Sequence, residues 1–120
     1  MRERFDVGFL DPVEPFELDP GNRPHLFKHV EAVGSHWIAF GEEDLRDVYL
    51  SDRTQFYPAS EEGDAHWLMV GEIPGGPVLV IPLAPPNSGD VTQCRPIGIY
   101  SADRDLRATY LQDAERKYRP

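Results

Sequence analysis

Apolar side chains recur along this chain in short blocks whose spacing predicts helices in some places and strands in others. A first helix is predicted to begin at Pro24, because a proline's missing N–H costs nothing in the first helical position. His25, Lys28 and His29 would lie together on its outer face, toward solvent or a ligand. The buried stripe opposite them, at helical spacing, consists of Leu26, Phe27, Val30 and Val33.

Two further helices follow from the same periodicity. One is predicted over residues 42–50, where Gly41 can cap the helix and an acidic first turn suits the positive end of its dipole. The other begins after Ser101 or Asp103, either of which can cap it, and runs toward the C-terminus. Its apolar face consists of Leu106, Tyr110, Leu111, Ala114 and Tyr118.

Between these helices lie blocks rich in β-branched and aromatic residues, which predict strands. Asp19-Pro20-Gly21 and Pro74-Gly75-Gly76 are tight-turn signals, and the second should join two of these strands as a hairpin. Pro82 has no N–H to donate to a sheet, which predicts a sheet edge or a bulge there. Pro96 and Gly98 should kink the strand that contains them. The predicted strands are residues 5–10, 16–18, 56–57, 66–73, 77–83 and 92–100.

These elements predict an α+β fold, a small antiparallel sheet of three to four strands with helices packed against it. At 120 residues the chain has the length of one domain with one modest core. Residues 16–120 are predicted to form that domain. Residues 1–15 are expected to be a loosely attached N-terminal arm.

The formal net charge is −9, but it is unevenly distributed. Residues 1–90 carry 6 Lys/Arg against 17 Asp/Glu, a balance of −11, whereas residues 91–120 carry 6 against 4, a balance of +2. A uniformly acidic protein binds nucleic acid poorly, because phosphate contacts need local cations. Any contact with phosphate should therefore involve the C-terminal third, helped by Lys28. The acidic remainder should either bind a basic partner or serve as a solvated surface.

The sequence carries no segment typical of a membrane or secreted protein. The N-terminus lacks the apolar run of a signal peptide, and the longest apolar stretch, Val78 to Ala84, is far shorter than the ~20 residues of a membrane span. Cys94 is the only cysteine, so no internal disulfide is possible, and it is predicted to be an inert buried thiol. We therefore expect a cytoplasmic protein that makes no membrane contact.

Five short strings, in a fixed order along residues 16–118, point beyond the fold class to a family. They are Phe16-Glu17-x-Asp19-Pro20; His25-x-x-Lys28-His29; Phe40 to Tyr49, followed by Ser51-Asp52; Trp67 to Gly71, followed by Val78-Leu79-Val80; and Arg95-Pro96-Ile97, followed by Tyr100-Ser101-Ala102. In this order they resemble the opening, the helices, the central hairpin and the last strand of BrnT-type toxins, a branch of the RelE-like ribonucleases.

The resemblance implies a BrnT/RelE-like fold and a toxin-type endoribonuclease that attacks RNA through the 2′-hydroxyl, without metal or other cofactor. It also implies a neighbouring antitoxin that wraps and inhibits the toxin; no contact with DNA is expected from this chain alone. Such cleavage needs a base for the hydroxyl, cations for the phosphate and an acid for the leaving oxygen. The catalytic residues would be Lys28, His29, Arg95 and Arg104, and RNA would also be bound by Arg107 and Tyr100.

These residues also have structural interpretations. Arg95 could pair with an acidic neighbour on the sheet, and Arg104 and Arg107 could face solvent beside their own helix. His25 and His29 could be ordinary exposed helix residues. Their spacing could offer two imidazoles to a metal, but no third ligand is close in the sequence, so no metal site is predicted.

The alternative function is a non-catalytic protein-binding module that retains the fold but has lost nuclease activity. It is favoured by the acidic charge and by Asp103, which stands where the family has an arginine. The chain also has extra residues at 31–37 relative to the family pattern. The Lys28-His29 pair and the basic C-terminal third favour the enzyme.

Overall fold

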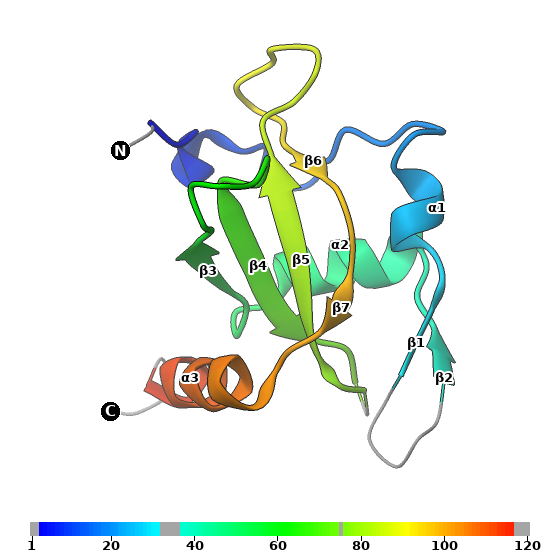
Figure 1. The fold of residues 1–120 in the computed structure, drawn as a ribbon, viewed down its shortest axis with the longest axis vertical. Helices are drawn as coiled ribbons and strands as arrows, with labels where there is room; N and C mark the ends of the chain where they lie inside the picture. Colours follow the sequence, from blue (N-terminus) through cyan, green and yellow to red (C-terminus); the bar gives the residue numbers. More distant parts are fainter. Residues whose placement is uncertain (1–2, 32–36, 75, 117–120) are drawn as a thin grey trace.

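A central hairpin of two apolar strands organises the chain (Figure 1). The computed structural model describes residues 3–31, 37–74 and 76–116, with only the backbone of Glu31. No helix in these ranges is long and apolar enough to cross a membrane. The elements are η1 (Val7–Phe9), α1 (Arg23–Leu26), β1 (His29–Glu31), β2 (Trp37–Ala39), α2 (Glu42–Leu50), β3 (Gln55–Pro58), β4 (Trp67–Glu72), β5 (Val78–Ala84), β6 (Arg95–Pro96), β7 (Tyr100–Ser101) and α3 (Arg104–Arg116).

The main sheet is antiparallel, with β3, β4, β5 and β6 in that order and β7 also paired with β5. β1 and β2 form a separate antiparallel pair, which lies against β7. The predicted α+β class with an antiparallel sheet is confirmed. The main sheet has five strands rather than three to four, because the strand predicted over residues 92–100 is interrupted at Ile97–Ile99 and pairs as two pieces, β6 and β7.

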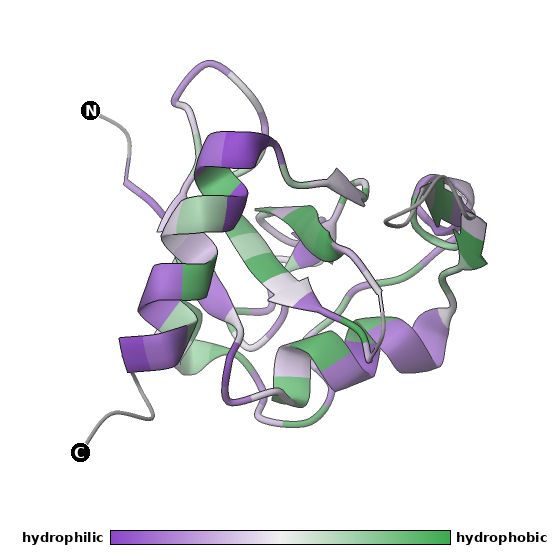
Figure 2. Cartoon of the chain, turned by 90° about the horizontal axis from the view of Figure 1, so that it is seen from below, coloured by the Kyte–Doolittle hydropathy of each residue, from purple (hydrophilic) through white to green (hydrophobic). Residues whose placement is uncertain are grey.

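Both faces of the central hairpin are buried. Side chains alternate between the two faces of a strand, and in β5 the side chains on both faces are mostly apolar, so each face needs a covering layer. Figure 2 shows α2 and α3 on opposite sides of the sheet. One core contains Leu45 and Val48 of α2, and the other contains Tyr110 and Ala114 of α3. The strand residues in the α2 core are Met69, Leu79, Ile81 and Leu83, and those in the α3 core are Val70, Val78 and Val80.

The two later helices are confirmed. α2 begins after Gly41, whose N–H donates to Asp44 Oδ2 at 2.8 Å. α3 begins after Asp103, whose Oδ1 accepts the N–H of Leu106 at 2.8 Å. A carboxylate at a helix start also suits the positive end of the dipole. Tyr118 of the predicted apolar face lies outside the described residues.

The predicted first helix is wrong beyond its first turn. α1 ends at Leu26, and the chain continues into β1, where Val30 is buried opposite Ile38 of β2. Pairing with a later segment outweighs the helical spacing of the apolar residues. The outer helix face predicted to gather Lys28 with two histidines therefore does not exist, and Val33 lies outside the described residues.

Pro82 lies within β5, a central strand, so the predicted sheet edge is wrong. The alternative, a bulge, is found in the neighbouring strand: Leu83 pairs with Pro96 but Val80 pairs with Tyr100, which leaves one extra residue opposite Pro82. The Pro82 carbonyl accepts the N–H of Ile97 at 3.0 Å. In an antiparallel strand the N–H and C=O positions of one residue point the same way. The missing donor therefore faces the interruption between β6 and β7, where no regular ladder needs it.

The N-terminal arm is fastened to the sheet rather than loosely attached, and η1 replaces the short strand predicted there. Arg4 donates to the carbonyls of His66 at 3.0 Å and Ala59 at 2.8 Å. Phe5 donates its N–H to His66 Nδ1 at 3.1 Å, and its carbonyl accepts from Trp67 Nε1 at 2.9 Å. These bonds hold the arm at the start of β4.

Gly71 of β4 offers a test of how closely α2 packs on the sheet. A Cβ at this position would lie 2.6 Å from Thr54 Oγ1 and 2.8 Å from Val48 Cγ1. We expect Gly71→Ala to lower the free energy of unfolding by about 1–3 kcal/mol, as overpacking does in other cores. Gly98→Ala is the matched control, since a Cβ there meets nothing within 4 Å. Urea unfolding measures both, and equal stability of the two variants would contradict the packing described.

Candidate functional site

The predicted catalytic residues do not all come together. Arg95 of β6 lies opposite Ala84 at one end of β5, whereas Ser101 of β7 lies opposite Leu79 near the other end. These positions on an extended strand are about 17 Å apart. Arg104 follows β7 at the start of α3, so Arg95 and Arg104 are too far apart to hold one phosphate.

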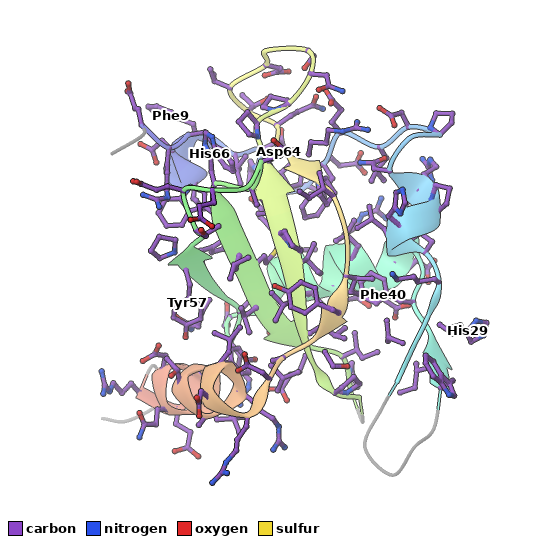
Figure 3. The ribbon with its side chains drawn as sticks, viewed as in Figure 1. Phe9, His29, Phe40, Tyr57, Asp64 and His66 are labelled. Atoms are coloured by element: carbon purple, nitrogen blue, oxygen red, sulfur yellow. The ribbon has the colours of Figure 1, made fainter. Side chains whose placement is uncertain are left out.

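Three of the other predicted residues, Lys28, His29 and Tyr100, flank the junction between β1 and β7. Lys28 precedes β1, His29 opens it, and Tyr100 opens β7; the two strands are in contact. Arg107 follows in α3, and all four side chains are exposed. Figure 3 shows His29 pointing outward from the hairpin. Fewer of the predicted catalytic and RNA-binding residues therefore lie together at this junction than the sequence predicted.

Arg95 is held between two carboxylates. Its Nη1 donates to Asp19 Oδ2 at 2.5 Å and to Glu17 Oε1 at 3.3 Å, and its Nη2 donates to Asp19 Oδ1 at 3.0 Å. The Arg95 side chain is 15% exposed. Arg95, aided by the backbone N–H groups of Gly21 and Asn22, lowers the pKa of Asp19 from 3.8 to about 2. Such a bidentate, charge-assisted contact supports the structural interpretation of Arg95.

The same cluster joins separate segments of backbone. Glu17 accepts the N–H groups of Asn87 at 2.8 Å and Ser88 at 3.0 Å. Buried Asn22 donates its side-chain amide to the carbonyls of Glu17 at 2.8 Å and Pro96 at 2.9 Å. The strand predicted for this segment is reduced to a single parallel bridge. Side-chain hydrogen bonds therefore pair the backbone groups here and connect the segments, as the hydrogen bonds of a regular sheet do elsewhere.

The residues that line a hollow of about 430 Å³ beside Arg95 include two that the sequence analysis did not select, Asp64 and His66. Figure 3 labels both at the end of the central hairpin. His66 Nδ1 accepts the N–H of Phe5, and the two rings stack with centroids 5.4 Å apart. An accepting Nδ1 requires a neutral imidazole with its proton on Nε2. His66 thus holds the arm in place. Its position after an acidic loop, at the start of a strand, was the only signal that could have marked it.

A second hollow, of about 560 Å³, lies between the N-terminal arm and the loop before β6. Phe9 and Val91 line it and are 63% and 71% exposed. The Asp11 N–H donates to Thr92 O at 2.8 Å and joins the two walls. No sequence motif marks this Phe9–Val91 groove, because its walls come from distant parts of the sequence. Its other apolar lining residues are Phe5, Pro85 and Pro86.

Neither histidine spacing nor the cysteine indicates a reactive centre. Across residues 3–31, 37–74 and 76–116, no three His, Cys, Asp or Glu side chains gather as a metal site requires. His25 lies in α1 and His29 in β1, so they lack the helical spacing that suggested a pair of ligands. Burial raises the pKa of the Cys94 thiol to about 12, which confirms the predicted buried thiol and keeps it protonated.

The Arg95 cluster and the Phe9–Val91 groove have different chemical capacities. A phosphate at Arg95 would have to displace Asp19 and approach the negative charge of Glu17. The groove instead exposes apolar surface, which another apolar group could remove from water. Comparison of the chain with protein-family models, curated proteins and solved structures found no match.

The Arg95–Asp19 pair predicts how stability depends on acid. The pKa of Asp19 is lower in the folded chain than the ordinary 3.8, so the unfolded chain binds more protons in this range. The contribution of the pair to the free energy of unfolding is present above pH 3.8 and is lost as the pH falls toward about 2. We expect Asp19→Asn to remove this part of the pH dependence in urea unfolding curves. Asp47→Asn makes the same charge change on exposed α2 and should leave it in place; an acid profile of Asp19→Asn as steep as that of the wild type would contradict the assignment.

Proposed function

We propose that this chain is a protein-binding module that keeps a BrnT/RelE-like fold and does not cleave RNA. The observation that carries the proposal is the state of Arg95, the residue that the family resemblance would assign to the phosphate. Asp19 occupies its guanidinium fork and Glu17 adds a second negative charge. Binding RNA there would cost both the existing pair and the repulsion between phosphate and carboxylates.

The distribution of the other cations also supports this proposal. Metal-independent cleavage requires a base, an acid and cations within hydrogen-bond reach of one phosphodiester. Lys28 and His29 belong to the β1 segment, and Arg104 belongs to α3. The register separates the β7–α3 end of the sheet from Arg95. The predicted set therefore lacks the convergence that catalysis needs.

Surface chemistry favours recognition of a protein. Residues 1–90 have a balance of −11, which repels nucleic acid and attracts basic partners. Phe9 and Val91 expose apolar surface next to one another in a single groove. Protein interfaces commonly combine an apolar anchor at the centre with charged groups at the rim.

A toxin-type endoribonuclease is the second candidate, and one observation favours it. The contact between β1 and β7 brings the exposed segment that carries Lys28 near exposed Tyr100. α3, with Arg104, begins shortly after Tyr100. An RNA strand stacked on Tyr100 could meet cations from both elements without using Arg95.

Induced expression in a bacterial host separates the two functions. The proteins to compare are the wild type and two double variants, Lys28→Ala/His29→Ala and Arg104→Ala/Arg107→Ala. Both double variants change exposed residues and leave the Arg95 cluster intact. We expect growth and total RNA to be unchanged for all three, because no cleaving centre is assembled. Circular dichroism of the purified proteins provides the folding control.

Growth arrest with loss of RNA in the wild type, relieved in either double variant, would establish the ribonuclease. That outcome would remove the binding-module proposal. Arrest that persists in both double variants would exclude the Lys28 and Arg104 site and would also count against a purely non-catalytic module if RNA is lost.

A further inference from the structure

We propose that the Phe9–Val91 groove docks a basic segment of a partner protein, which inserts one apolar side chain between Phe9 and Val91. This inference rests on the proposed binding function and specifies its site and the chemistry of its partner. The groove lies between the arm that carries η1 and the loop of residues 85–93. Neither wall contains a residue that was predicted to cleave or bind RNA.

The groove has the size and surface of a recognition site. Its volume of about 560 Å³ falls in the range that accommodates a few side chains. Phe9 and Val91 are among the most exposed large apolar residues in the described chain. Pro85 and Pro86 add apolar surface that loses little conformational freedom on binding. An inserted Leu or similar side chain would bury surface that water now covers.

Hydrogen bonds to the rest of the chain hold both walls of the groove. On the arm, Arg4 is bonded to the carbonyls of Ala59 and His66, and the Phe5 carbonyl accepts from Trp67. Beyond η1, the hydrogen bond between Asp11 and Thr92 joins the arm to the opposite loop. A groove fixed in this way avoids most of the ordering cost that a flexible arm would add to binding.

The charge around the groove selects a basic occupant. Glu3 and Asp6 are exposed on the arm, and Asp90 is exposed beside Val91. Arg4 is the one cation among the described lining residues, and the carboxylates of Glu3, Asp6 and Asp90 outnumber it. A segment with Lys or Arg on both sides of an apolar residue would match both the rim and the floor.

The same charges disfavour two other occupants. A second copy in a two-fold dimer would place this acidic rim against itself, since an isologous interface pairs each patch with its own copy. An RNA strand would bring phosphates to the same carboxylates. A basic protein segment is therefore the occupant to which the surface is complementary.

Fluorescence anisotropy with a short labelled peptide of lysine and arginine around two central leucines tests the proposal on the full chain. We expect Phe9→Ser and Val91→Ser each to weaken binding by about tenfold or more, as loss of an anchor contact does. Replacing the peptide leucines by serine should weaken binding similarly. Higher salt should weaken it further, because the rim contacts are electrostatic.

Trp37→Ser is the matched control, because it removes a 65% exposed aromatic side chain from β2, outside the groove. It should leave the affinity unchanged. Both groove substitutions are at exposed positions, and each tests the site independently if the other fails to fold. Circular dichroism verifies the fold of every variant.

Absence of peptide binding to the wild type would overturn the proposal, as would equal weakening by Phe9→Ser and Trp37→Ser. Concentration-dependent dimerisation that Val91→Ser abolishes would identify a second copy as the occupant and would also overturn it. So would a labelled RNA oligonucleotide that binds the groove in preference to the peptide. Peptide binding at the groove together with RNA loss in the expression test would instead keep the groove and remove the non-catalytic function.

Discussion

The burial of β4 and β5 on both faces is the constraint on which the rest of this structure depends. A strand with one buried face needs one covering layer. β5 has apolar side chains on both of its faces and therefore needs two. α2 covers one side and α3 the other, so the C-terminal helix is part of the core. The contact is close enough at Gly71 that even a methyl group would meet α2 and the following turn. The faces of β4 and β5 are therefore closed to a functional site, which must lie at the ends or edges of the sheet or on the outer surfaces of the covering elements.

At one such end, Arg95 shows why a residue's role depends on its neighbours. The sequence places an arginine in the last strand, where it resembles a family motif and could bind phosphate. In the fold its charge is matched by Asp19 and Glu17, and the latter also caps the backbone of the 87–88 segment. Releasing Arg95 for a substrate would leave two carboxylates without their cation, and the phosphate that replaced them would lie close to both negative charges. A cation bound in this way stabilises connections between segments.

Local patterns predicted the elements that are stabilised locally. The bounds of α2, the hairpin of β4 and β5, and the start of α3 after Asp103 all follow from short-range spacing, turn residues and caps. The errors lie where distant segments decide the outcome. Val30 is drawn into a strand by Ile38, and Pro82 is accommodated by a break in the neighbouring strand. For the same reason the candidate site was predicted only in part. Arg95 could be selected by its motif, but its carboxylate partners and the Phe9–Val91 groove depend on chain segments far apart in sequence.

The use of arginine inside the fold explains how an acidic surface can serve recognition. Arg23, Arg46 and Arg53 each pair with a glutamate, and Arg95 pairs with two carboxylates. Arg4 supports the groove wall through backbone carbonyls. Each of the four paired arginines neutralises a carboxylate that it contacts, so it leaves the other Asp and Glu uncompensated. Excess negative charge is therefore left at the surface, including Glu3, Asp6 and Asp90 at the rim of the apolar groove. Complementary charge mainly speeds association and selects partners, whereas burial of an apolar anchor provides most of the affinity; this surface supplies both kinds of contact for a basic protein segment.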